Sequence, residues 1–111
     1  MLSSHPLVSS APETWVNLPL AYMTRDLGQL AEYNQWVAST AINTFVGRLS
    51  EGESDWYRLS GEFVRTLYQR ASSDSAVYFL DKTPRYYYIV DYLERSQPDA
   101  RFIFLFRNPI Q

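Results

Sequence analysis

The sequence contains no cysteine and a single histidine, His5. Disulfide bonds and thiolate metal centres are therefore excluded, and because one histidine cannot form a metal cluster alone, we expect no bound metal. There is also no apolar run of the roughly 18 residues that a membrane span requires, and no basic leader typical of a secretory signal. These absences favour a soluble cytoplasmic protein without a membrane partner.

An excess of charge of one sign is also absent. Ten basic and twelve acidic residues leave a net charge of −2 on 111 residues, without the basic face that nucleic-acid-binding proteins usually carry. We therefore expect no nucleic-acid partner, and any anion site must be local. A hydrophobic content of 46% is typical of a folded chain, and the length suits a single domain spanning residues 1–111.

Apolar spacing predicts two helices in the middle of the chain, at residues 24–49 and about 55–71. The second helix places Trp56, Leu59, Phe63 and Leu67 along one face, with charged residues largely on the other. The intervening segment "SEGES" breaks the pattern, so the two helices should form a hairpin. The Ser/Pro-rich residues 3–12 are expected to form a loop, with a short extended piece near residues 7–10.

The last third of the chain changes to a strand, helix, strand pattern. Residues 76–80 and 101–106 are apolar runs without polar alternation, which is typical of strands covered on both faces in a parallel sheet. Between them, apolar residues at i, i+3, i+4 and i+7 from Tyr86 to Leu93 predict a helix over residues 85–96. A right-handed crossover would set the two strands side by side in an α/β fold.

The two strand tips are the informative positions, because ligands of open parallel sheets bind beyond the carboxyl ends of the strands. Lys82 follows the first predicted strand and Arg107 ends the second, so both cations are expected at one edge of the sheet. Thr83 suits a helix cap and Pro84 a first turn, and free N–H groups there would add positive potential. Such an edge could hold a phosphate or sulfate dianion. The alternative for Lys82 is a solvated loop lysine. The alternative for Arg107 is a surface ion pair with an acid such as Asp81 or Asp99.

The segment "FLDKTPRYYYIVDYLERSQPDARFIFLFRNPIQ" resembles the centre of sulfotransferases that use 3′-phosphoadenosine 5′-phosphosulfate (PAPS). In that family a Lys-Thr-Pro-Arg-Tyr turn, a helix, a Pro-Asp-Ala turn and a strand ending in Arg-Asn-Pro or Arg-Asp-Pro follow in this order. The stretch "SSHPLVSSAPETW" is similar to the region just after the family's phosphosulfate-binding loop. The resemblance implies a partial P-loop-type three-layer α/β fold, with a short parallel sheet and flanking helices.

The resemblance also implies a role for four residues. Arg107 resembles the arginine that grips the nucleotide 3′-phosphate, for which a bidentate guanidinium is suited. Lys82 resembles the lysine that neutralises charge around the transferring sulfuryl group. Glu13 looks like the general base that takes a proton from the attacking hydroxyl or amine, although an acid at a helix start is an equally good reading. Arg85 is a weaker candidate for an anion or substrate contact, with a solvated first-turn residue as the alternative.

PAPS would be the sulfuryl donor, and the acceptor would be a small molecule, a carbohydrate or a protein. The family's phosphate-cradling loop is missing: all four glycines lie in or between the predicted helices. We therefore expect an incomplete sulfotransferase domain whose isolated activity is weak or absent, since sulfuryl transfer depends on charge stabilisation.

Unpaired strand edges of such a fragment would also be a route to homo-oligomers. The alternative function is a non-catalytic α/β protein-interaction module. Another P-loop transferase, such as a kinase, is disfavoured because no Gly-rich loop ending in Lys and Ser or Thr is visible.

Overall fold

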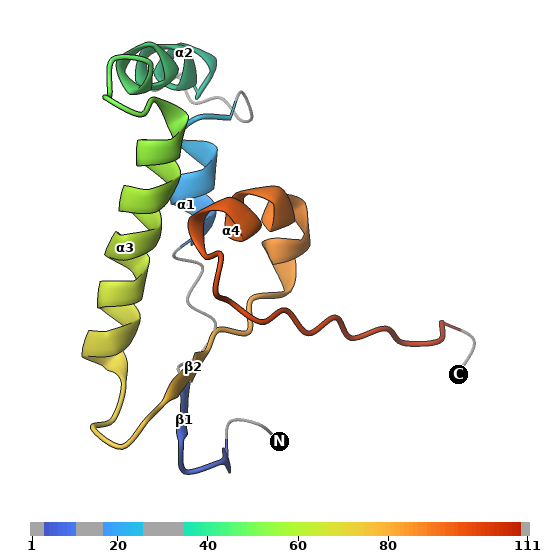
Figure 1. Ribbon diagram of the computed structural model, residues 1–111. Helices are drawn as coiled ribbons and strands as arrows, with labels where there is room; N and C mark the ends of the chain where they lie inside the picture. Colours follow the sequence, from blue (N-terminus) through green and yellow to red (C-terminus); the bar gives the residue numbers. More distant parts are fainter. Residues whose placement is uncertain (1–3, 11–16, 26–34, 110–111) are drawn as a thin grey trace.

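The computed structural model describes residues 4–10, 17–25 and 35–109. Along the chain the elements are β1 (Val8–Ser10), α1 (Asn17–Tyr22), α2 (Gln35–Val46), α3 (Glu53–Ala71), β2 (Tyr78–Leu80), the 3-10 helix η2 (Pro84–Ile89) and α4 (Val90–Ser96). In Figure 1, α3 is the long helix, α2 crosses one end of it, and the two strands meet beyond its other end. The fold is therefore mixed α/β.

The sheet has two parallel strands, β1 and β2. Val8 pairs with Tyr78, Ser9 with Phe79 and Ser10 with Leu80. Beyond the ladder, the Ser73 N–H donates to Ser9 Oγ at 3.0 Å and so ties β1 to the loop that precedes β2. The short extended piece predicted near residues 7–10 is confirmed, and it supplies the neighbour of β2.

The strand predicted at residues 101–106 is absent from this sheet. In the described part of the chain these residues form an extended arm that runs away from the helices and the sheet (Figure 1). Exposure along the arm rises from 40% for Phe102 to 92% for Phe106. The predicted pairing of 76–80 with 101–106 is therefore wrong. An apolar run indicates that a strand will be covered, but only backbone hydrogen bonds to a specific neighbour define its place in a sheet.

The helices confirm most of the predicted pattern. Helix α3 covers the segment predicted at 55–71 and begins after Gly52, whose φ of 58° is one that few other residues adopt. Helix α2 accounts for the second half of the helix predicted at 24–49, of which residues 26–34 lie outside the described ranges. The helix predicted at 85–96 is divided into η2 and α4.

The core lies between α1, η2 and α4. Its buried members are Leu18, Ala21, Ile89, Tyr92 and Leu93. The apolar pattern predicted from Tyr86 to Leu93 faces this cluster at both ends. Leu93 is a buried member of it, and the partly buried Tyr86 packs against it.

Helix α3 buries a different face from the apolar one. Its apolar side chains are largely exposed: Leu59 at 47%, Phe63 at 55% and Leu67 at 40%. The buried positions are Ser60, Gly61 and Val64, where small side chains allow α4 to approach closely. Among the described residues, none of the helices is both long enough and apolar enough to cross a membrane.

Candidate functional site

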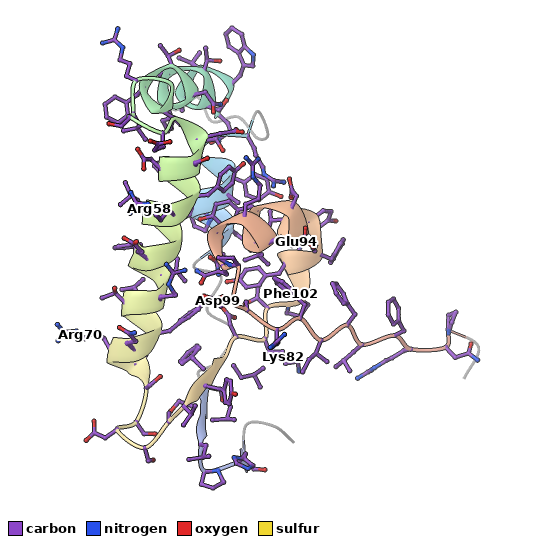
Figure 2. The ribbon with its side chains drawn as sticks, in the orientation of Figure 1. Arg58, Arg70, Lys82, Glu94, Asp99 and Phe102 are labelled. Atoms are coloured by element: carbon purple, nitrogen blue, oxygen red, sulfur yellow. The ribbon has the colours of Figure 1, made fainter. Side chains whose placement is uncertain are left out.

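The predicted site begins at the tip of β2, where residues 81–83 connect the strand to η2. Lys82 is the only lysine of the sequence, and it lies where β2 leads into η2 (Figure 2). Burial alternates along the tip: Asp81 is half-buried, Lys82 is exposed and Thr83 is buried. Because successive side chains of extended backbone point to opposite sides, Asp81 and Thr83 face the protein while Lys82 faces solvent.

The Asp81 carboxylate accepts hydrogen bonds from three hydroxyl groups. Thr83 Oγ1 donates to Oδ1 at 2.8 Å, and the Tyr86 hydroxyl donates to Oδ2 at 2.8 Å. The Tyr68 hydroxyl, from the C-terminal part of α3, donates to the same Oδ2. Hydrogen bonds to an ionised acceptor are roughly twice as strong as neutral ones, so these three bonds hold the Asp81 side chain in one position. Thr83 was expected to cap the following helix, but it makes no side-chain cap bond there.

Asn17 forms a second layer behind the two phenols. Its Nδ2 donates to the Tyr68 hydroxyl oxygen at 3.0 Å and to that of Tyr86 at 3.1 Å, and its backbone N–H donates to Tyr86 at 3.2 Å. The side chain is buried, and Oδ1 has no hydrogen-bond partner among the described residues. We call Asn17, Tyr68, Asp81, Thr83 and Tyr86 the Asp81 network. It joins α1, α3, η2 and the tip of β2.

The environment keeps Tyr68 protonated. Burial, followed by the hydrogen bond to Asp81, raises the pKa of its phenol. The ring also stacks on Phe79 of β2, with centroids 4.4 Å apart and planes within 9°. Tyr68 is therefore fixed both as a ring and as a hydrogen-bond donor.

Two other predicted site residues, Arg107 and Arg85, do not join this cluster. Arg107 follows the exposed arm of residues 101–106, which runs away from β2 (Figure 1) and is no part of its sheet, so Arg107 does not share a sheet edge with Lys82. Glu13 lies outside the described residues. Arg85 is exposed on η2 and belongs to a hollow of about 430 Å³ lined by Leu18, Pro19, Tyr22, Arg85 and Tyr88. The functional roles of these residues and of Lys82 stay predictions.

A second hollow, of about 420 Å³, lies between α3 and α4 and is lined partly by arginines. Its arginines have partners. Arg58 pairs with Asp55 at 2.9 Å and Glu62 at 3.3 Å, while Arg95 pairs with Glu53 at 2.8 Å. The third arginine, Arg65, donates to the Ser96 carbonyl oxygen at 3.1 Å and to Gln97 Oε1 at 3.2 Å. Two of the three charges are thus offset by acids and the third guanidinium is engaged, which makes this hollow a poor anion site. Within residues 4–10, 17–25 and 35–109, no group of three or more metal-ligating side chains occurs.

Sequence reasoning missed most of the Asp81 network. Its members are distant along the chain: Asn17 and Tyr86 are 69 residues apart, and Tyr68 and Asp81 are 13 apart. One local signal was available, because an extended Asp-Lys-Thr tip that exposes its lysine must turn the aspartate and the threonine inward together.

Comparison with known proteins places the chain in a family. Residues 1–111, the whole chain, match the sulfotransferase family. The chain is also 31% identical over 110 residues to the nodulation protein NoeE of Sinorhizobium fredii (strain NBRC 101917 / NGR234), a match that covers 98% of this chain and 25% of NoeE. It thus spans about a quarter of that relative's length. No solved structure matches it. On the strength of the match over its whole length, the chain belongs to the sulfotransferase family.

Proposed function

We propose that this chain contributes to an enzyme that transfers a sulfuryl group from PAPS to an acceptor hydroxyl or amine. The observation that carries the proposal is the family match over residues 1–111. The exposed Lys82 at the carboxyl end of β2 supports it, because this is where α/β folds bind anionic ligands. Lys82 forms no ion pair with the residues that the structure describes, so its charge is not offset there by a carboxylate.

In the proposed reaction the acceptor oxygen or nitrogen forms a bond to sulfur, and the bond from sulfur to the phosphate oxygen breaks. Adenosine 3′,5′-bisphosphate leaves, and Glu13 takes the acceptor proton. Lys82 stabilises the negative charge around the sulfuryl group, for which a charged hydrogen bond contributes about 1.5 to 3 kcal/mol. Arg107 binds the 3′-phosphate. PAPS supplies an activated sulfuryl group, and no metal is required.

We place the acceptor in the hollow beside Arg85. Its volume of about 430 Å³ suits a small molecule, a sugar unit or a peptide side chain. The lining combines the rings of Tyr22 and Tyr88 with one guanidinium, so it offers apolar surface and a hydrogen-bond donor together. Arg85 follows Lys82 by three residues, which sets this hollow on the element that begins at the β2 tip.

The isolated 111 residues are expected to transfer sulfuryl groups weakly or not at all. The chain corresponds to a quarter of NoeE, and its sequence shows no glycine-rich loop of the kind that cradles a phosphosulfate. Tests of function should therefore use the natural protein that carries these residues.

Binding of adenosine 3′,5′-bisphosphate tests the nucleotide assignment. Arg107→Ala should weaken binding by at least about tenfold, the loss expected when one charged hydrogen bond is removed. Arg101→Ala is the matched control, because Arg101 is an exposed arginine at the base of the same arm. Titration calorimetry supplies both affinities. A wild-type protein that ignores the nucleotide, or an Arg107→Ala variant that binds like wild type, would overturn the assignment.

The exposed arm favours a second candidate function, a non-catalytic interaction module. Residues 102–106 are all apolar and all exposed, and Leu105 is 83% exposed. In such a module Lys82→Ala and Glu13→Ala would leave partner binding intact. Substitutions in the arm would abolish it.

A further inference from the structure

The Asp81 network takes no direct part in the proposed chemistry, yet it converges on the residue next to Lys82. Tyr68 from α3 and Tyr86 from η2 donate directly to Asp81, and Asn17 from α1 donates to both phenols. Asp81 receives the phenol hydrogens, and the phenol oxygens in turn receive the amide hydrogens of Asn17. Every bond in this chain of donors runs in one direction, toward the carboxylate.

That direction makes the network specific for a carboxylate. An ionised aspartate offers only acceptors, and here it receives three hydroxyl donors. An asparagine at position 81 would present one acceptor and one NH₂ group. The negative charge that strengthens all three bonds would be lost, and at least one of the three hydroxyl groups would have to turn from donor to acceptor. The isosteric amide is therefore not an equivalent residue.

The network fixes the residues on both sides of Lys82. Asp81 is held by Tyr68 and Tyr86, and Thr83 is held by Asp81 itself at 2.8 Å. With its two neighbours anchored on the inner side of extended backbone, Lys82 is directed to the outer side. Its exposure and the burial of Thr83 agree with this arrangement.

We propose that Asp81 is a positioning residue, which holds the tip of β2 so that Lys82 is presented outward at a fixed point toward an anionic group. The identity of that group, the sulfuryl donor, rests on the proposed function. Tyr68 and Tyr86 act with Asp81 as its hydrogen-bond donors, and Asn17 sets their orientation from behind.

Lysine labelling makes the tip observable in the natural protein. In protein labelled with ¹⁵N-lysine, the backbone signal of Lys82 is the one that disappears in Lys82→Arg. We expect an order parameter near 0.85 in the wild type, the value of rigid backbone, and below about 0.6 in Asp81→Asn and in the Tyr68→Phe/Tyr86→Phe double variant. The double variant keeps both rings and removes only the two hydroxyl donors, so it remains informative if Asp81→Asn fails to fold.

Two controls separate positioning from general loss of stability. Tyr87→Phe removes a hydroxyl on the same 3-10 helix from a side chain that is 63% exposed and outside the network. Val64→Ala opens a cavity at a fully buried position of α3. Both variants should keep the Lys82 signal of the wild type at a temperature where all proteins are folded.

Kinetics in the natural protein supply a readout that a merely structural role would not move. Asp81→Asn and the double variant should lower kcat for sulfuryl transfer at least tenfold with little change in the KM for PAPS, while Val64→Ala and Tyr87→Phe keep the kcat of the wild type. An unchanged Lys82 order parameter in both network variants would overturn the proposal. So would a kcat that survives the loss of order at Lys82.

Failure of the proposed function has a different signature. In that case the wild-type protein transfers no sulfuryl group and binds no adenosine 3′,5′-bisphosphate, but the Lys82 signal still loses order in the network variants. That result supports the role of Asp81 in fixing the tip and discards only the identity of the anion.

Discussion

Gly61 of α3 and Ser96 at the end of α4 lie in direct backbone contact. A Cβ atom added to Gly61 would lie 1.9 Å from the Ser96 carbonyl oxygen and 2.8 Å from its carbonyl carbon. Arg65 crosses the same contact and donates to the Ser96 oxygen at 3.1 Å, and Gln97 Nε2 donates to the Gly61 oxygen at 3.1 Å. The close packing of α4 on α3 thus requires a residue without a side chain, glycine, at position 61.

Gly61→Ala should therefore destabilise the fold. The added methyl group meets backbone rather than a movable side chain, so the helices must separate, at a cost of about 1 to 3 kcal/mol in the free energy of unfolding. Gly47→Ala is the control, because the nearest atom to its added Cβ would be 3.5 Å away. Urea denaturation measures both. Equal stability of Gly61→Ala and the wild type would contradict the close packing.

Tyr68 should make the protein sensitive to alkali. Burial and the bond to Asp81 raise the pKa of its phenol, so above pH of about 10 the unfolded chain loses a proton that the folded chain retains. Stability is then fully present below about pH 10 and falls as pH rises, by up to about 1.4 kcal/mol per pH unit for one proton. Thermal melting between pH 8 and 11 should show a shallower decline for Tyr68→Phe.

The matched control for the alkaline experiment is Tyr78→Phe. The Tyr78 side chain is 65% exposed on β2 and has no bond to Asp81, so this variant should follow the wild-type slope. A Tyr68→Phe protein with the full wild-type slope would show that the phenol is not shielded as described.

Asp91 should contribute to stability at neutral pH and lose that contribution in acid. Its hydrogen bond with Arg25, at 2.7 Å, is the main reason why its pKa is lowered. A depressed pKa gives stability above the unfolded value of about 3.9, which disappears as pH falls through the folded value. Because the Asp91 side chain is 76% exposed, Asp91→Asn should cost only about 0 to 1 kcal/mol at pH 7.

The difference between Asp91→Asn and wild type should vanish near pH 2, as measured by urea midpoints across the acid range. Asp99→Asn removes a comparable exposed acid that forms no ion pair with a described residue, and it should leave the curve unchanged. A difference that persists unchanged into acid would point to packing instead of charge.

Much of the fold was predictable because it follows from local pattern. The helix at α3, the break before it, the short extended piece at β1 and the strand at β2 all follow from residue spacing and from Gly52. The lysine at the β2 tip was placed correctly for the same reason. These features depend on a few neighbouring residues.

The neighbours in space were not predictable from such patterns. The run from Phe102 to Phe106 predicts a covered strand but carries no information about its partner, and β1 takes the place beside β2. Phe63 and Leu67 form an apolar stripe, yet α4 packs on the small residues beside it. The Asp81 network joins α1 to η2 over 69 residues, so the local pattern of the Asp-Lys-Thr tip indicates that Asp81 and Thr83 face inward but not which partners they meet.

The exposed arm should promote self-association. Its apolar side chains and unpaired backbone offer an edge to another chain, so we expect the isolated 111 residues to form oligomers at high concentration. Leu105→Lys should reduce association in sedimentation velocity without lowering the melting temperature, since Leu105 is 83% exposed. A loss of stability in this variant would mean that the arm packs against the fold.

Transfer of a labelled sulfuryl group from PAPS tests the central claim most directly. In the natural protein, Lys82→Ala should lower kcat/KM by about 100-fold or more, the usual effect of removing one group that stabilises transition-state charge. Arg70→Ala is the control, because Arg70 projects from the last turn of α3 away from the other elements (Figure 2). An Lys82→Ala protein that transfers sulfuryl groups at the rate of Arg70→Ala would contradict the role assigned to the tip of β2.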